Sequence, residues 1–222
     1  MLSLQLTAIA TERTTAATDA LLAVAVVAGI TWLHRHAPAS LRRTVWLSGL
    51  ALFALAAVLG AIAHGVELDP RTRELLWQPL FLALGAALAL FSAGAIGDWR
   101  GDASARRALP FLLAVALGFY LLTRLSGGKF LVFVLFEAAA LLFALAVYVG
   151  LALRKRTGAG LVVVGLVLSL VGAVLQATSL SLWFIWEFNH NGLYHLVQLI
   201  GVIFLITGLR GTLSVPHAGG AS

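Results

Sequence analysis

Seven long apolar runs dominate the sequence and restrict what it can fold into. Each is close to the roughly 20 residues that an α-helix needs to cross a bilayer core about 30 Å thick. The runs are too long for strands and lack the alternation of polar and apolar residues that is typical of an outer-membrane barrel. The sequence therefore predicts an all-α, polytopic membrane protein with seven transmembrane helices, at residues 15–33, 44–64, 74–97, 108–126, 129–153, 158–184 and 190–210.

The composition agrees with this prediction. Hydrophobic residues make up 61% of the 222 residues and charged residues only 11%, whereas soluble domains are about 45–50% apolar and about 25% charged. This difference excludes a soluble globular protein and a disordered one. Because the loops between the runs are short, we expect a single seven-helix domain over residues 1–222. The absence of cysteine excludes a disulfide framework, a thiol nucleophile and a zinc site built from cysteines.

The basic residues predict how the helices are oriented. They lie in short clusters between the apolar runs, which is typical of membrane topology and not of a nucleic-acid-binding face, so we expect no nucleic-acid partner. Because the number of helices is odd, the two termini are expected on opposite sides of the membrane. Ten of the 15 Lys and Arg residues then fall on the side of the C-terminus and five on the side of the N-terminus. Because cytoplasmic loops carry the excess of positive charge, we predict an outside N-terminus, a cytoplasmic C-terminus and a location in a bacterial inner (cell) membrane. Six tryptophans near the ends of the runs are expected to anchor the helices at the membrane interfaces, namely Trp32, Trp46, Trp77, Trp99, Trp183 and Trp186.

Polar residues inside the runs gather in the half of the membrane on the side of the N-terminus. Two helices carry them as stripes, with Glu12, Thr15 and Asp19 on the first helix and Asn191, His195 and Gln198 on the seventh. The other polar residues in this half are His64, Glu74, Gln78, Glu137, Gln176 and His190. The opposite half is expected to be almost purely apolar up to its basic loops, which argues against a channel through the membrane.

The energy of burying these groups in lipid predicts that they meet. A carboxylate deep in a helix costs about 2.5–3.5 kcal/mol on insertion scales, so several such groups facing lipid would rival the free energy of folding. We therefore predict one polar pocket that opens toward the extracytoplasmic side. Its expected lining is Asp19, His64, Glu74, Glu137, Gln176, Asn191 and His195, with Glu12, Thr15, Gln78, His190 and Gln198 beside them. The alternative is a hydrogen-bond network that only joins the helices.

Histidines and carboxylates on separate helices are typical ligands of a catalytic zinc ion. Two histidines and a carboxylate leave the fourth position of zinc for a water molecule, whose pKa the metal lowers toward about 7. The expected ligands are His64 and His195, with Glu137 or Asp19 as the third. Glu74 is expected to donate and accept protons during catalysis. Asp19 is expected to share this role if it does not bind the metal. Glu137 could instead carry protons, as acids within membranes often do.

The layout resembles the superfamily of seven-helix membrane proteins that includes alkaline ceramidases and adiponectin/progestin receptors, often called CREST, and would represent a bacterial branch of it. Members carry a histidine at the end of helix two, an acid near the start of helix three and a His-x-x-x-His pair at the start of helix seven. His64 matches the first of these, His195 matches the second histidine of the pair, and Asp69 and Glu74 are both candidates for the acid. Asn191 stands where the first histidine of the pair is expected, and Gly60 stands where the family has a serine. The resemblance implies a zinc ion used to hydrolyse lipid amides.

Three functions follow from the pocket and the resemblance. The first is a zinc-dependent hydrolase that acts on a lipid amide or ester reaching the pocket from the outer leaflet. The second is a receptor-like protein that binds a lipid or another small ligand without chemistry. The third is a proton-coupled carrier that uses Glu137 and Asp19. In each case the expected partners are membrane lipid and a lipid-like substrate or ligand, and the sequence leaves the oligomeric state open.

Overall fold

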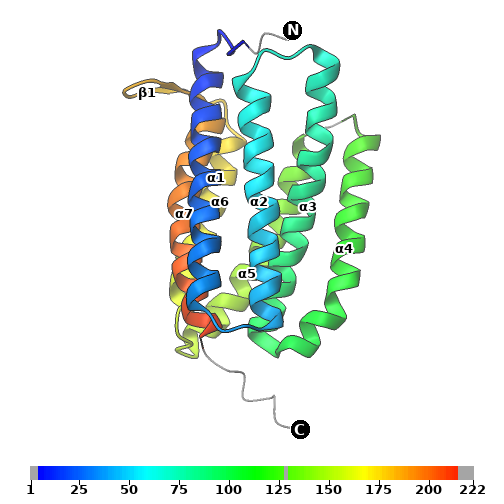
Figure 1. Ribbon diagram of the computed structural model, residues 1–222, viewed down its shortest axis with the longest axis vertical. Coiled ribbons are helices and arrows are strands. Elements are labelled where there is room, and N and C mark those ends of the chain that lie inside the picture. Colours follow the sequence, from blue (N-terminus) through cyan, green and yellow to red (C-terminus); the bar gives the residue numbers. More distant parts are fainter. Residues whose placement is uncertain (1–4, 128–129, 215–222) are drawn as a thin grey trace.

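The computed structural model describes residues 5–127 and 130–214, and in them the chain forms seven α-helices and one short β-hairpin (Figure 1). The elements are α1 (Ala10–His36), α2 (Leu41–Gly65), α3 (Pro70–Arg100), α4 (Asp102–Leu125), α5 (Phe130–Leu153), α6 (Ala159–Gln176), β1 (Leu182–Trp183), β2 (Glu187–Phe188) and α7 (His190–Leu213). All seven helices are long and apolar enough to cross a membrane. The prediction of an all-α chain with seven candidate spans is therefore confirmed, and these spans are consistent with an integral multi-pass membrane protein.

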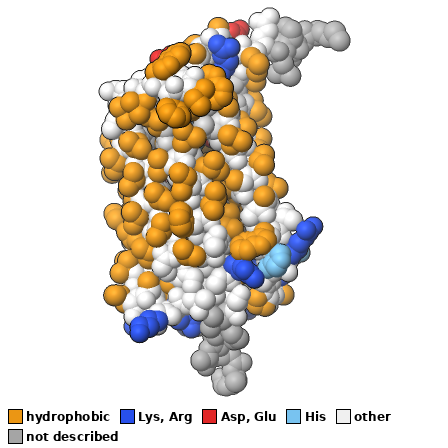
Figure 2. Space-filling model, turned by 90° about the vertical axis from the view of Figure 1, so that its left-hand side faces the viewer, with side chains coloured by type: hydrophobic (Ala, Val, Ile, Leu, Met, Phe, Trp, Pro, Cys, Tyr) orange, Lys and Arg blue, Asp and Glu red, His pale blue; other side chains and the backbone are white. Residues whose placement is uncertain are grey.

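Six of the helices form a closed ring. Helix α1 packs against α2 and α7, and the ring continues from α2 through α3, α5 and α6 back to α7. Helix α4 lies outside the ring, mainly against α3 (Figure 1). Hydrophobic side chains cover the flank of the bundle and charged ones lie toward its two ends (Figure 2). We call the end where α1 begins the N-terminal end and the end where α7 finishes the C-terminal end.

Helices α2 and α3 begin before their apolar runs, and a polar side chain caps each of them. Ser40 accepts a hydrogen bond from the amide of Arg43 at the start of α2. Asp69 does the same for α3, whose first residue is Pro70. The pKa of the Asp69 carboxyl lies below its ordinary value because it accepts hydrogen bonds from the hydroxyl and the amide of Thr72. Hydropathy predicts starts at residues 44 and 74, because the first turns of these two helices carry charged residues and do not belong to the apolar runs. Both helices therefore begin earlier than predicted. The predicted start of the fifth run, residue 129, lies outside the described residues.

The sixth predicted run is too long. Residues 158–184 were expected to form one helix, but α6 ends at Gln176 and the chain then forms the β1–β2 hairpin. Thr178 turns the chain, because its hydroxyl donates to the carbonyl of Leu175 and accepts from the amide of Leu180. In the hairpin, Leu182 pairs with Phe188 and Trp183 with Glu187. A short stretch of apolar and aromatic residues suits a strand as well as a helix, so hydropathy alone could not place this boundary.

A buried polar cluster occupies the C-terminal end of the ring. Asp98 is only 2% exposed, and its carboxylate accepts hydrogen bonds from Arg42, Trp46 and Tyr148, with Thr212 at 3.4 Å. The expectation that this half of the bundle is apolar up to its loops is therefore wrong. Trp46 is 1% exposed and was wrongly taken for an interfacial anchor. Its indole N–H needs a buried acceptor, which Asp98 supplies from the neighbouring helix.

Candidate functional site

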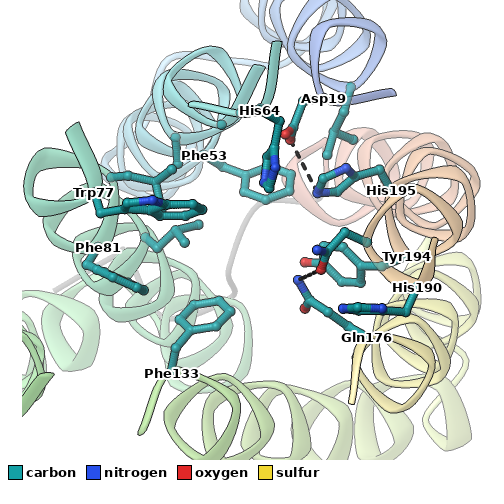
Figure 3. Close-up of a pocket in the computed structure, with 17 residues that line it drawn as sticks. Asp19, Phe53, His64, Trp77, Phe81, Phe133, Gln176, His190, Tyr194 and His195 are labelled. Carbon is teal, nitrogen blue, oxygen red and sulfur yellow. Dashed lines mark hydrogen bonds and ion pairs between the residues drawn. The ribbon is translucent and has the colours of Figure 1, made fainter. Parts of the chain in front are cut away.

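A pocket of about 360 Å³ lies inside the helix ring, toward the N-terminal end (Figure 3). Six helices contribute to it, and only the peripheral α4 does not. Its lining consists of Asp19 and Leu22 from α1, Phe53, Ala56, Ala57, Gly60 and His64 from α2, Trp77, Leu80, Phe81 and Leu84 from α3, Phe133 from α5, Gln176 from α6, and His190, Asn191, Tyr194 and His195 from α7. Pockets of this volume are large enough for a small organic ligand.

The two sides of the pocket differ in chemistry. Trp77, Phe81 and Phe133 form an aromatic wall, whereas Asp19 and His195 face them from the other side (Figure 3). Trp77 and Phe81 are four residues apart on α3 and therefore share one face of the helix. The aromatic wall is suited to the apolar part of a ligand, and the opposite side offers hydrogen-bonding groups to a polar part.

Asp19 and His195 form the central polar contact. The imidazole Nε2 lies 3.3 Å from Asp19 Oδ1, and the imidazole Nδ1 lies 3.3 Å from the hydroxyl oxygen of Thr18. The Thr18 hydroxyl already donates to backbone carbonyls of the preceding turn, those of Thr14 and Thr15. It has only one hydrogen, so it accepts from Nδ1–H of the imidazole. Nε2 then faces the carboxyl group, and the contact requires one proton, either on Nε2 or on Asp19.

His64 is held by a second carboxylate. Its Nδ1 lies 2.6 Å from Glu12 Oε2, and its ring meets the Trp77 ring edge-on at 5.7 Å. The contact with Glu12 fixes the orientation of the ring, as a carboxylate does behind many functional histidines. It leaves Nε2 without a hydrogen bond within the described part of the chain.

Two amides line the pocket where α6 ends and α7 begins, at the N-terminal end of the bundle. Gln176 donates to Asn191 Oδ1 at 3.3 Å. The buried Gln176 Oε1 has no hydrogen-bond partner among the described residues. A buried acceptor without a donor is costly, so this position favours a water molecule or the donor group of a ligand. Next to it, Thr15 donates to Asn189 Oδ1 at 3.0 Å and thereby ties α1 to the start of α7.

Glu137 does not line this pocket, although it was expected to. Its Oε1 accepts a hydrogen bond from the Tyr194 hydroxyl at 3.3 Å, and it lines a narrower cavity of about 40 Å³ deeper in the ring. Gln198 lines the same cavity. Glu137 Oε2 and Gln198 Oε1 are buried without a partner in the described structure, and the cavity has room for about one or two water molecules. Tyr194, the hydrogen-bond partner of Glu137, by contrast lines the larger pocket.

Glu74 and Gln78 also lie elsewhere. They line a groove of about 610 Å³ between the start of α3 and the end of α4, together with Arg73 and Arg124. The groove adjoins the pocket, because Trp77 belongs to both linings. Glu74 is exposed at the outer end of α3 and so has no need of a buried partner. Of the expected lining, the pocket thus brings together Asp19, His64, Gln176, Asn191 and His195, with His190 beside them and Glu12 behind His64.

As arranged, these side chains do not make a zinc site. Within residues 5–127 and 130–214, no group of three or more His, Asp or Glu side chains is placed to hold a metal ion. Both ring nitrogens of His195 are engaged, by Thr18 and Asp19, and Glu137 is separated from His64 and His195. The donors that the sequence suggested therefore do not fit a metal in this conformation.

The aromatic wall was not foreseen from the sequence. The sequence predicts an interfacial position for Trp77, and hydropathy does not distinguish Phe53, Phe81 and Phe133 from the other apolar residues of their runs. The available signal was the spacing of Trp77, Phe81 and Leu84 at i, i+4 and i+7, which puts all three on the helix face that also carries the pocket lining. In a fully apolar helix, however, such a face does not differ in hydropathy from the faces that contact lipid.

The comparisons with known proteins define a family without an assigned activity. A family model described as a family of unknown function, DUF6962, matches residues 14–214. The match covers most of the chain, so the chain belongs to this family. No curated protein and no solved structure matches it. A proposal about function must therefore rest on the geometry of the pocket.

Proposed function

We propose that the protein binds a small, lipid-like amphipathic molecule in the pocket, as a receptor-like component of a bacterial inner membrane. The observation that carries the proposal is the division of the pocket into an aromatic wall and a hydrogen-bonding wall (Figure 3). An apolar cavity with a few convergent polar groups is the usual form of a small-molecule site. The apolar part of the ligand would lie against Trp77, Phe81 and Phe133, and its polar group near Asp19 and His195.

The proposed orientation places this pocket near the extracytoplasmic face. Ten of the 15 basic residues lie toward the C-terminal end of the bundle, and the positive-inside rule assigns that end to the cytoplasm. The pocket residues Asp19, His64 and His195 lie in the outward half under this assignment. The ligand would then come from the periplasm or from the outer leaflet of the inner membrane.

Photo-crosslinking in proteoliposomes tests the proposal. A dodecanol analogue that carries a diazirine and an alkyne on its chain is added, irradiated and located by peptide mass spectrometry. We expect crosslinks to the pocket-facing turns of α2 and α3, with competition by unlabelled dodecanol. Leu80→Trp, which fills the pocket from a side chain that is 5% exposed, should reduce crosslinking at least about tenfold, because the added ring takes the space of the chain.

The matched control is Leu75→Trp, the same substitution on the same helix at a side chain that is 60% exposed. It should leave crosslinking in the pocket unchanged. Ala57→Leu is a milder way to fill the pocket and keeps the test valid if Leu80→Trp does not fold. Crosslinks that are confined to lipid-facing residues, or that are equal in Leu80→Trp and Leu75→Trp, would contradict the proposal.

A zinc-dependent hydrolase is the second candidate, and one observation favours it. His64 binds Glu12 through Nδ1 and keeps Nε2 free of hydrogen bonds in the described structure, which is how a carboxylate prepares a histidine to bind a metal. The remaining donors would have to move, because His195 is engaged on both nitrogens. Protein purified without chelators should then contain about one zinc per chain and hydrolyse a ceramide-like amide, and both should be lost in His64→Ala. Zinc below about a tenth of an equivalent would count against this candidate.

A further inference from the structure

The β1–β2 hairpin is an exposed apolar element that leaves the bundle near the N-terminal end (Figure 1). Trp183 and Phe184 are 77% and 80% exposed, and Ile185 and Trp186 are both 63% exposed. These four residues are consecutive and include the turn of the hairpin, where the Phe184 amide donates to the Trp186 carbonyl. Such a concentration of large apolar side chains outside the core requires an explanation.

The arrangement of these side chains favours lipid over water or a protein partner. Trp183 lies in β1, and Phe184, Ile185 and Trp186 form the connection to β2. All four side chains are at least 63% exposed, so neither face of the hairpin tip is polar or covered by the bundle. A ribbon that docks on a protein buries one face and keeps the other polar. A ribbon in water would expose both faces, at about 25 cal/mol for each Å² of apolar surface. Lipid can surround both faces at once.

The backbone sets how deep the hairpin can lie. The sheet has two strands, so each strand has one edge that is not paired with the other. Unpaired N–H and C=O groups are not tolerated in the hydrocarbon core, but they can bind water and headgroups at its boundary. Tryptophan prefers the same boundary because its ring is apolar and its N–H is a donor. The depth that satisfies both the side chains and the backbone is the junction between headgroups and acyl chains.

The base of the hairpin is attached firmly enough to hold this position. The Thr14 hydroxyl on α1 donates to the Glu187 carbonyl at 2.7 Å, and the Ser181 hydroxyl donates to the Phe188 carbonyl at 3.1 Å. One residue separates β2 from His190 and five separate β1 from Gln176, and both of these residues line the pocket. The depth of the hairpin in the leaflet is therefore also close to the depth of the pocket.

We propose that the hairpin tip, residues 182–186, inserts into the headgroup–acyl boundary of the leaflet at the N-terminal end and holds the bundle at a fixed depth there. This interaction involves the lipid surface alone and does not depend on whether the pocket binds a ligand. The partner is therefore the membrane itself, contacted by Trp183, Phe184, Ile185 and Trp186.

The chain has no cysteine, so a single introduced cysteine can report the depth directly. Phe184→Cys is labelled with bimane and reconstituted in liposomes that carry a nitroxide either near the headgroup or near the end of the acyl chain. Leu117→Cys, at a side chain that is 52% exposed in the middle of α4, is the control for the hydrocarbon core. Ala103→Cys, at an exposed side chain in the first turn of α4, is the control for water.

We expect the shallow nitroxide to quench Phe184→Cys at least about twofold more than the deep nitroxide, since interfacial elements lie about 5–10 Å into the boundary. Leu117→Cys should show the reverse order. Quenching of Phe184→Cys no stronger than that of Ala103→Cys would overturn the proposal, because the hairpin would then lie in water. Efficient disulfide crosslinking between two copies of Phe184→Cys would overturn it as well, because the hairpin would then pair with another chain. Ile185→Cys repeats the test at a second site.

Discussion

At the scale of single residues, the polar groups at the two ends of the bundle have different roles. Those in the pocket leave acceptors without donors, as at Gln176, and are suited to a ligand or water. Asp98 instead is buried and receives donors from Arg42, Trp46 and Tyr148, so its acceptor oxygens are satisfied within the protein. The sequence indicated the first group because its acids and histidines stand out in apolar runs. It did not indicate the second, because Asp98 lies at the end of its run, where a charge is expected to reach water.

Replacing Asp98 tests this structural role. Asp98→Ala leaves Arg42 buried without its main counter-charge and should destabilise the protein by about 3–5 kcal/mol. Asp102→Asn removes a second carboxylate near Arg42, but this side chain is 41% exposed, so the loss should be below about 1 kcal/mol. The measurement is the midpoint of denaturant unfolding in detergent. The double variant Arg42→Met with Asp98→Leu should be more stable than Asp98→Ala because it removes the unpaired buried charge, but less stable than the unmodified protein because the buried Trp46 N–H and Tyr148 hydroxyl lose their acceptor. A double variant no more stable than Asp98→Ala would contradict the role given to the pair.

At the scale of helices, the backbones of α6 and α7 approach each other closely at two glycines. A Cβ atom on Gly165 would lie 2.7 Å from the Gly201 carbonyl oxygen, and one on Gly201 would lie 3.0 Å from the Gly165 carbonyl oxygen. Small residues at such crossings let backbones approach and supply packing where no hydrophobic effect drives helices together. The sequence could predict the helices themselves from the length of their apolar runs. It could not predict which glycines lie at a crossing, because the chain has 22 of them.

The α6–α7 contact offers a matched pair of substitutions. Gly165→Ala should destabilise the protein by about 1–3 kcal/mol, because its methyl group would meet backbone atoms that cannot move aside. Gly160→Ala, on the same helix with nothing within 4 Å of the added atom, should be neutral or slightly stabilising. Thermal unfolding in detergent measures both. Equal effects of the two substitutions would show that propensity, and not the contact, determines the stability of α6.

At the scale of the whole molecule, the sequence predicted the architecture better than the site. Seven candidate spans follow from hydropathy, and the meeting of Asp19, His64 and His195 in one pocket follows from the cost of charges in lipid. The rotation of each helix does not follow from them. The rotation of α5 about its axis makes Glu137 face Tyr194, and the rotation of α3 makes Glu74 face the α3–α4 groove. Both residues nevertheless lie at about the expected height along the bundle. The aromatic wall likewise appears only when α2, α3 and α5 are placed together.

The proposal for the whole molecule is a pocket that is open to molecules from the extracytoplasmic face. Ala57 of α2 lines this pocket, whereas Ala95 of α3 is fully buried outside it. Because the chain has no cysteine, Ala57→Cys introduces a single thiol in the pocket and Ala95→Cys provides the buried control. The most direct measurement is the rate at which a small, membrane-impermeant thiol reagent labels each variant in intact cells and in inverted vesicles. The account predicts that Ala57→Cys is labelled in intact cells, at least about tenfold faster than Ala95→Cys, and is protected by dodecanol. Labelling of Ala57→Cys at the rate of Ala95→Cys, or only in inverted vesicles, would contradict it.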